Sequence, residues 1–295
     1  MNPRLSLQGR TEKNDIGLQN THPEPLTLRV NDYVSLRLYR DTRPHCLETA
    51  SLQKGLVLMR NSEEMVEEGM GFGAPVAIYR DEPYFSSTSQ CSIREGTYGK
   101  TLLKTFVMDT VSRKKIGKAA YFNGGLYSLF HRIFHAFYTL NLPLTPVFNR
   151  FIASATIIGV STEFVRVKPR GRVNIEYALQ ADSVLVEASF ARLEKVGCDQ
   201  IMLLNEQGAG FFTKYSDSNG QAFVGAKIGA WVPVNADQAA LSDIGGKLGF
   251  SLKKLQNAVL FRGREAIRGR YSWVGLSYSL RPSNAAFKYT IKLKM

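Results

Sequence analysis

Residues that mark several well-known protein classes are scarce in this chain of 295 residues. Its three cysteines, Cys46, Cys91 and Cys198, lie far apart and form no CxxC pair. The sequence therefore predicts neither a disulfide framework nor a zinc or thiol-redox motif. We expect no cofactor, and the cysteine usage favours a reducing, cytoplasmic location.

Long apolar runs are also missing. A helix that crosses a bilayer needs roughly 18–20 apolar residues, and the most apolar stretch, residues 126–160, is interrupted by histidine, arginine, asparagine and proline. Residues 1–24 lack the apolar core of a signal peptide and are predicted to form a polar N-terminal tail. With 44% apolar residues, residues 25–295 are expected to form a single large domain with a full core.

Acidic residues are few near the C-terminus. Residues 241–295 contain eleven Lys or Arg against two acidic residues, whereas residues 181–240 contain four against seven. A local excess of this kind attracts anionic partners such as nucleic acid, acidic lipid or acidic glycan. A basic surface that is only exposed to water and binds no partner explains the same counts, so both alternatives stay open.

What the sequence has in abundance is alternation of apolar and polar residues, which is typical of half-buried strands. Three hairpins are predicted, with turns at Asn31–Asp32, Pro169–Arg172 and Asn219–Gly220. The last residues, Phe287–Met295, predict a strand with a lysine-rich outer face.

One region has the spacing of an amphipathic helix. Apolar residues recur every three or four positions from Gly125 to Leu140, and Thr145 predicts the start of a second short helix. The chain is therefore expected to be mainly β, a large antiparallel β-sandwich with a short two-helix insertion at about residues 124–154.

Two sequence patterns that suggest ligand sites are better explained by a structural role. His131 and His135 are four residues apart, as in some metal sites, but no third ligand is indicated and we expect no metal. Gly69, Gly71 and Gly73 alternate before a stretch that reads as a strand, whereas a phosphate-binding loop leads into a helix. These glycines predict a bulge or the close approach of another element.

Glu206 is the candidate catalytic residue. It follows the apolar run IMLL and precedes Phe211 and Phe212, so partial burial would raise its pKa and suit it to proton transfer. The surrounding NEQG is also typical of an ordinary turn. No serine or cysteine has the sequence context of an activated nucleophile.

The tripeptide RGR occurs three times in the sequence. A glycine between two arginines permits a tight turn in which both guanidiniums bind one phosphate or carboxylate, although a solvated hairpin tip explains each copy as well. The two tryptophans offer flat faces for stacking on a sugar or a base. The predicted ligand-binding residues are Arg170, Arg172, Trp231, Arg262, Arg264, Arg268, Arg270 and Trp273.

Two functions of different classes fit these observations. The first is a carbohydrate-binding or carbohydrate-acting β-sandwich, its reaction unspecified, that holds a sugar or another small anionic ligand. In scale and β content the chain is similar to the large sandwich of aldose epimerases and related sugar-binding domains, with no residue motif in common. The alternative is a non-catalytic binder of an anionic polymer, above all nucleic acid, through the basic C-terminal segment.

Overall fold

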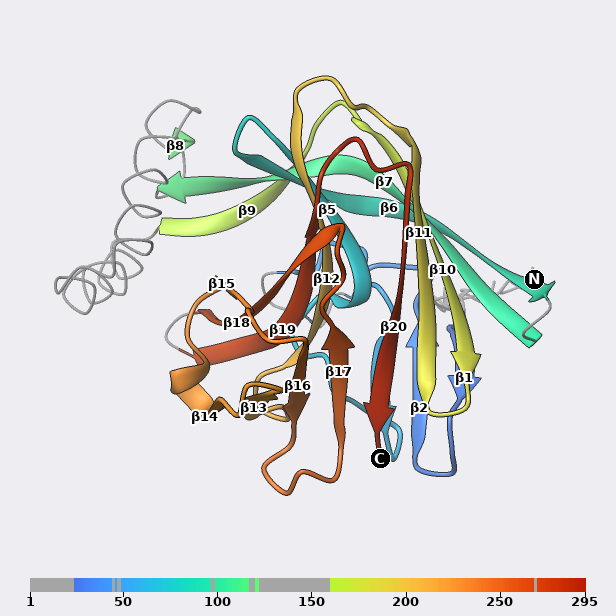
Figure 1. The fold of residues 1–295 in the computed structure, drawn as a ribbon. Helices are drawn as coiled ribbons and strands as arrows, with labels where there is room; N and C mark the ends of the chain where they lie inside the picture. Colours follow the sequence, from blue (N-terminus) through green and yellow to red (C-terminus); the bar gives the residue numbers. More distant parts are fainter. Residues whose placement is uncertain are drawn as a thin grey trace, which may run out of the picture.

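Antiparallel strands dominate the computed structural model of this protein (Figure 1). The structure describes residues 24–43, 46, 49–96, 99–116, 120–121, 160–267 and 270–295. The prediction of a mainly β protein with large antiparallel sheets is confirmed. The predicted two-helix insertion at about residues 124–154, with His131 and His135, lies outside the described residues.

A small sheet of four strands stands at the N-terminal end. Its strands are β1 (Leu26–Arg29), β2 (Val34–Leu38), β3 (Val57–Arg60) and β4 (Glu63–Glu64). β1 and β2 pair with Leu26 opposite Leu38, which confirms the first predicted hairpin. A bridge between Leu56 and Phe72 connects this sheet to the larger one.

The larger sheet contains the remaining sixteen strands in the order β14-β13-β16-β17-β20-β11-β10-β7-β6-β5-β12-β19-β18-β15, with β8 and β9 also paired to β7. A 3₁₀ turn, η1 (Gly225–Ile228), follows β14. The strands are β5 (Gly71–Tyr79), β6 (Glu82–Gly96), β7 (Gly99–Ile116), β8 (Ala120–Tyr121), β9 (Val160–Arg166), β10 (Gly171–Gln180), β11 (Ser183–Leu193), β12 (Cys198–Gly208), β13 (Lys214–Asp217), β14 (Ala222–Val224), β15 (Val232–Pro233), β16 (Gln238–Ser242), β17 (Gly249–Lys253), β18 (Ala258–Ile267), β19 (Arg270–Leu280) and β20 (Ala286–Lys294).

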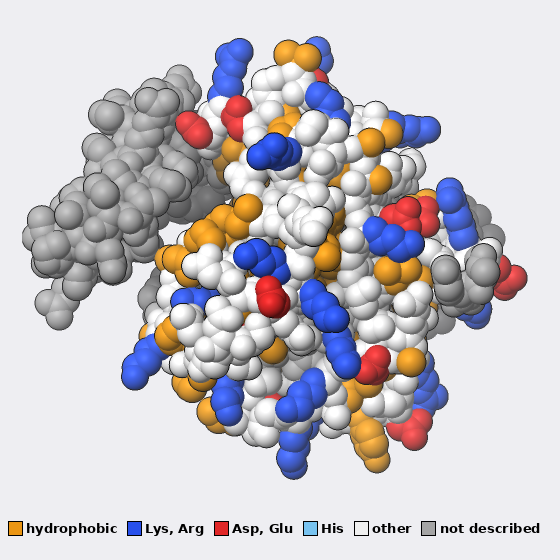
Figure 2. Space-filling view, viewed as in Figure 1, with side chains coloured by type: hydrophobic (Ala, Val, Ile, Leu, Met, Phe, Trp, Pro, Cys, Tyr) orange, Lys and Arg blue, Asp and Glu red, His pale blue; other side chains and the backbone are white. Residues whose placement is uncertain are grey.

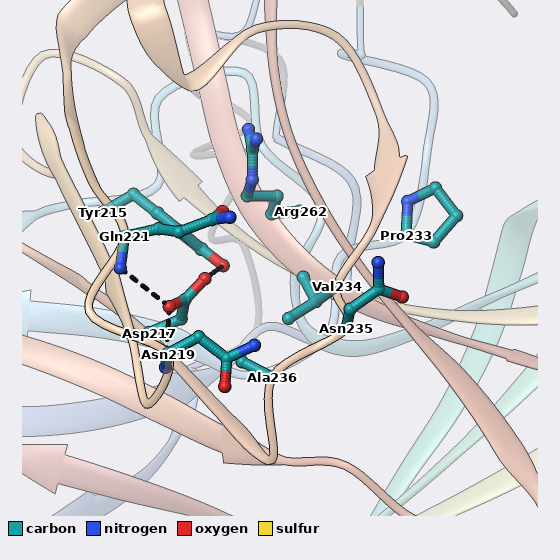
Figure 3. A pocket seen from close by; sticks show the side chains of 9 residues that line it. All are labelled: Tyr215, Asp217, Asn219, Gln221, Pro233, Val234, Asn235, Ala236 and Arg262. Atoms are coloured by element: carbon teal, nitrogen blue, oxygen red, sulfur yellow. Dashed lines mark hydrogen bonds between the residues drawn. The ribbon is translucent and has the colours of Figure 1, made fainter.

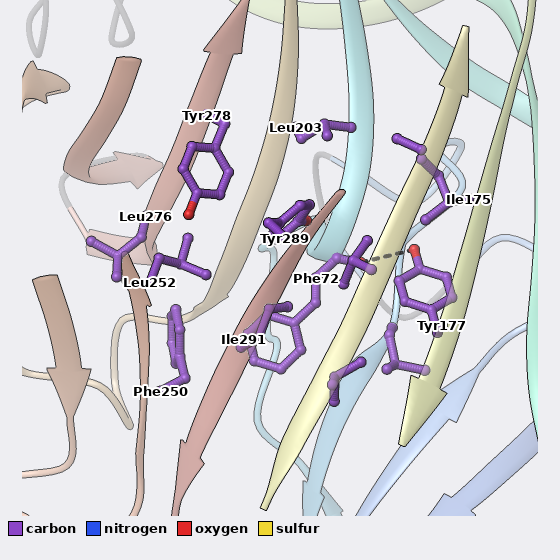
Figure 4. Packing of buried hydrophobic residues seen from close by; sticks show 14 of the residues in the cluster. Phe72, Ile175, Tyr177, Leu203, Phe250, Leu252, Leu276, Tyr278, Tyr289 and Ile291 are labelled. Carbon is purple, nitrogen blue, oxygen red and sulfur yellow. Dashed lines mark hydrogen bonds between the residues drawn. The ribbon is translucent and has the colours of Figure 1, made fainter. Parts of the chain in front are cut away.

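The core lies where distant parts of this sheet face each other (Figure 4). The rings of Phe72 on β5 and Phe250 on β17 meet edge to face, 5.0 Å apart. Tyr278 on β19 and Tyr289 on β20 make a similar contact at 4.9 Å. Because β5, β12 and β19 are not neighbours of β17 and β20 in the sheet, these contacts bury apolar side chains between two facing layers.

The second predicted hairpin is wrong. β9 and β10 do not pair with each other; both pair with β7, where Arg166 lies opposite Thr110 and Arg172 opposite Val107. Pro169 falls in the short break between them. A proline cannot donate to the ladder, so it interrupts a run of residues that continues along the same edge of β7 rather than reversing it.

Two further local predictions, on the third hairpin and on the alternating glycines, are confirmed. β13 and β14 form a hairpin around Asn219 and Gly220, in which only Gly220 of the two has a positive φ, 82°. Gly73 has a φ of 73°, and a Cβ there would lie 3.0 Å from the ring of Tyr177. The alternating glycines thus allow close packing, as the sequence predicts.

The C-terminal strand β20 has the predicted alternation of buried and exposed residues. Its exposed side chains Lys288, Lys292 and Lys294 form what we call the lysine face, and Lys288 is 3.4 Å from the carboxylate of Glu187 on β11. Figure 2 shows Lys and Arg side chains dispersed over the visible surface rather than gathered in one patch. Within the described ranges, no helix is long and apolar enough to cross a membrane.

Candidate functional site

The end of β12 presents polar side chains to opposite sides of the sheet. Asn205 points into the core, where its Oδ1 accepts hydrogen bonds from the Gly73 amide at 3.1 Å and the Tyr289 hydroxyl at 2.8 Å. Glu206, the next residue, therefore points to the other side. It is only 4% exposed, and its Oε2 accepts a hydrogen bond from the Met70 amide at 3.0 Å.

The indole of Trp231 lies across two glycines beside Glu206. Gly263 on β18 pairs with Gly275 on β19, which in turn pairs with Glu206. A Cβ at Gly263 would lie 2.7 Å from Cγ of Trp231, and a Cβ at Gly275 would lie 3.0 Å from the far edge of the same ring and 2.8 Å from Cγ of Glu206. Only glycine leaves room for the indole here, so the two glycines place it over the sheet next to the carboxyl group.

A second carboxylate completes this arrangement. Glu265 lies two residues after Gly263 on β18 and hence on the same side of the strand. Its Oε1 accepts a hydrogen bond from the indole Nε1 of Trp231. We call the group formed by Glu206, Trp231, Gly263, Glu265 and Gly275 the glutamate face.

The surroundings of Glu206 favour its neutral form. Burial raises the pKa of Glu206 to about 8, and the negative charge of Glu265 acts in the same direction. The hydrogen bond from Met70 and the positive charge of Lys54 lower this pKa, but by less than burial raises it. At neutral pH Glu206 therefore carries a proton, and an environment of this kind suits a carboxylic acid to donate one.

Of the predicted ligand-binding residues, both tryptophans lie on the same side of the sheet as Glu206. Trp273 lies on β19 opposite Gly208 and Glu265, on the same side as Gly275, so it belongs at the border of the glutamate face. Arg264 is on the core side of β18, where it is 9% exposed and its Nη2 donates to the Ala209 carbonyl at 2.8 Å.

Arg262 lies in a different place, beside a small polar hollow of about 60 Å³ (Figure 3). Its guanidinium packs over the rings of Tyr215 and Phe223, at 4.9 and 4.5 Å, and Nη1 donates to the Ile228 carbonyl. The tripeptide that contains Arg262 is not a turn, because it forms the interior of β18. There Gly263 serves the indole on one side, while both arginines point to the other.

The remaining arginines are not brought to Glu206 by any contact that the structure shows. Arg170 is within 3.2 Å of Glu194 and packs over Tyr79 and Tyr84, and Arg172 lies exposed on β10. Arg268 lies outside the described residues, and of Arg270 only the backbone, at the start of β19, is described. Their roles in ligand binding stay predictions.

Sequence reasoning missed Glu265 and the two glycines that seat Trp231. One signal was present: in a strand, the spacing Gly263 to Glu265 puts both residues on one side. The partner Gly275 was not recognisable, because it depends on how β18 and β19 pair. Among the residues that the structure describes, no three His, Cys, Asp or Glu side chains are grouped so that they could hold a metal ion.

Comparisons with known proteins were made by sequence and by structure. No family model and no curated protein matches the sequence. The alpha-N-acetylgalactosaminidase NagBb from Bifidobacterium bifidum, in its GalNAc complex, matches the structure with a TM-score of 0.45 and 9% identity, over 91% of this chain and 35% of that protein.

Two other solved structures are less similar. An alpha-mannosidase from Enterococcus faecalis V583 matches with a TM-score of 0.39 and 7% identity, over 92% of this chain and 29% of that protein. The protein HI1317 matches with a TM-score of 0.32 and 8% identity, over 92% of this chain and 99% of that protein. This chain thus spans about a third of the length of the first of these proteins.

Proposed function

We propose that this protein is a carbohydrate-acting β-sandwich that binds a sugar at the glutamate face and transfers a proton to it from Glu206. The observation that carries the proposal is a buried carboxyl group, protonated at neutral pH, beside an indole and a second carboxylate. A raised pKa produced by burial and a like charge is common where a carboxylic acid acts as a general acid.

The indole supplies the binding surface in this proposal. Ligand sites in proteins combine aromatic surface with a few placed polar groups. Glu206 is 4% exposed, so a ligand reaches it when the indole of Trp231 leaves its seat on Gly263 and Gly275. The hydrogen bond from Trp231 to Glu265 holds the indole in the closed position until then.

Proton transfer to an oxygen of the sugar follows from the two carboxyl groups. Glu206 donates its proton to the ring oxygen as the bond from that oxygen to the anomeric carbon breaks, and Glu265, once freed from the indole, accepts the proton of the anomeric hydroxyl, whose oxygen becomes the carbonyl of the open-chain sugar. With a glycosidic oxygen as the proton acceptor, the bond from that oxygen to the anomeric carbon breaks instead, and water adds to this carbon as it gives its proton to Glu265. General acid–base catalysis of this kind contributes roughly 10²- to 10⁴-fold in rate.

The test is a panel of neutral mono- and oligosaccharides, with binding followed by calorimetry and turnover by NMR of the anomeric protons. We expect Glu206→Gln to lower turnover by about 10²- to 10⁴-fold while the affinity changes little. Glu187→Gln is the matched control, because Glu187 is half exposed on β11, where it pairs with Lys288 on β20. Turnover that is unchanged in Glu206→Gln would remove Glu206 from the reaction, and no binding of any sugar would refute the function.

The nucleic-acid alternative is not favoured by a specific feature of the structure. Arg170 and Arg262 pack on aromatic rings and bind a carboxylate or a carbonyl, and the lysine face carries an acidic neighbour in Glu187. An experiment on salt dependence separates the two functions and is described in the Discussion.

A further inference from the structure

A second ionisable group, Lys54, is buried close to Glu206. Lys54 is 1% exposed and lies just before β3. Its Nζ donates to the Thr49 hydroxyl at 3.1 Å and to the Gly69 carbonyl. A buried ammonium is costly unless it is hydrogen-bonded and paired with a negative group, so its position requires an explanation.

One peptide group joins this lysine to Glu206. The carbonyl of Gly69 accepts from Lys54, and the amide of the next residue, Met70, donates to the Glu206 carboxyl at 3.0 Å. The C=O and N–H of a trans peptide point in opposite directions. The peptide dipole therefore has its negative end at the ammonium and its positive end at the carboxyl group.

The same peptide group is fixed in place. The Gly55 amide donates to the Met70 carbonyl at 2.7 Å, and the Gly69 amide donates to the Val66 carbonyl at 2.7 Å. A Cβ at Gly69 would lie 3.3 Å from the backbone of Gln207, so the segment rests directly on β12. A peptide held on both sides cannot rotate to break either hydrogen bond without moving the strand.

We propose that Lys54 is a positioning residue for Glu206, which it acts on through the Gly69–Met70 peptide, holding the carboxyl group in its orientation and setting the pH at which it loses its proton. The structure assigns this role to no other lysine that it describes. Lys104 is equally buried, but its Nζ donates to the carbonyls of Tyr39 and Lys54 and not to the peptide that contacts Glu206.

Other charged groups act on the pair and are part of the expectation. Glu265 raises the pKa of Glu206, while Lys54 lowers it. Burial lowers the pKa of Lys54, whereas Glu68 and the thiol of Cys46 raise it. The two sites are coupled, so what titrates is the pair rather than either residue alone.

The test is a pH titration of the protein labelled with ¹³C at the glutamate carboxyl groups, with Glu206→Gln identifying the signal of Glu206. We expect Lys54→Met to raise the midpoint of Glu206 by about one pH unit or more, which is tenfold in proton affinity, because a nearby positive charge is lost. Thr49→Val keeps the lysine but removes one acceptor, and we expect a smaller shift in the same direction. Lys104→Met removes an equally buried ammonium that donates to the Lys54 carbonyl rather than to the Gly69–Met70 peptide, and it should move the midpoint less than Lys54→Met does.

Two results would overturn the role of Lys54. One is an unchanged midpoint in Lys54→Met or, if that variant does not fold, in Thr49→Val. The other is an equal shift in Lys104→Met, which would show a general effect of burial. The meaning of this role for catalysis rests on the proposed function, but the titration needs no sugar, so the two can fail separately. Where turnover is found, Lys54→Met should shift its pH profile and lower kcat with little change in KM.

Discussion

The glutamate face and the lysine face are built by the same alternation of side chains along a strand, yet they treat a charged group in opposite ways. On β20 every second residue is exposed, and Lys288 meets Glu187 in water, with each side chain about half exposed. On β12 the residue that alternation places on the outside, Glu206, is 4% exposed beside an indole. Alternation identifies the two sides of a strand, but it does not show which side is covered.

The two faces differ in exposure because different residues cover the strands. Trp231 reaches the glutamate face because Gly263 and Gly275 leave a flat surface for it, and Met70 covers the other side of Glu206. The lysine face has no such glycine pair among the residues described on β11 and β20. Removal of a carboxyl group from water raises its pKa and so favours its neutral form.

The largest expected effect is on the pH dependence of stability. Because burial raises the pKa of Glu206 in the folded state to about 8, the folded protein binds a proton that the unfolded chain has already lost. The stabilisation is complete at low pH and is lost as the pH rises from the ordinary range of a carboxyl group to about 8, with a slope of up to about 1.4 kcal/mol per pH unit.

Urea unfolding between pH 5 and pH 9 measures this slope. Glu206→Gln should remove it, because glutamine does not titrate, and Glu187→Gln on the lysine face should keep it. Equal slopes in the wild type and in Glu206→Gln would mean that Glu206 is ionised in the folded protein, and the contrast between the two faces would disappear.

A smaller effect on stability is expected from adding a methyl group where the indole of Trp231 packs on the sheet. Gly263→Ala places a methyl group against the ring of Trp231, and overpacking of this kind costs about 1–3 kcal/mol. We expect Trp231 to move away from the sheet into water, which shifts its fluorescence emission to the red. The measurement is made in a Trp273→Phe background, so that Trp231 is the only tryptophan. Gly245→Ala is the control, because its nearest neighbour is a flexible lysine side chain 3.9 Å away. An unchanged emission in Gly263→Ala would contradict the placement of the indole.

The smallest effect is expected on the lysine face. Replacing Lys288, Lys292 and Lys294 by Gln should leave sugar affinity unchanged at all salt concentrations, because a neutral ligand releases no counterions. The ion pair of Lys288 with Glu187 is half exposed, so its loss should cost no more than about 1 kcal/mol.

The same variant decides between the two functions. Titration with single-stranded DNA should show no tight binding by the wild type. Should DNA bind, with log affinity falling against log salt by about 0.7 for each phosphate contacted and with a flatter slope in the triple variant, the nucleic-acid function would replace the sugar function.

Much of the architecture was predictable because it depends on neighbouring residues. The hairpins of β1 with β2 and of β13 with β14, and the alternation along β20, follow from local spacing and turn residues. The residues around Pro169 predict a reversal, whereas the pairing of both β9 and β10 with β7 shows that the chain continues along one edge of that strand. Pairings between distant strands leave no local signal.

The candidate site was predictable in part for the same reason. Glu206 was recognisable from the apolar run before it, and Trp231 as an aromatic surface. The register that sets Gly275 beside Gly263 and Glu206 joins three strands. The peptide between Lys54 and Glu206 belongs to a loop that is 15 residues from Lys54 but 136 residues from Glu206. Neither could be read before the strands were paired.

Asn205 fixes the position of the backbone at the neighbouring Glu206. Its amide oxygen joins β12 to β5 through Gly73 and to the facing layer through Tyr289. Because these hydrogen bonds join β12 to both layers of the core, we expect the backbone at Glu206 to open only when the core opens. In the proposed function the indole of Trp231 moves when a sugar binds, while the backbone that carries Glu206 stays held through Asn205.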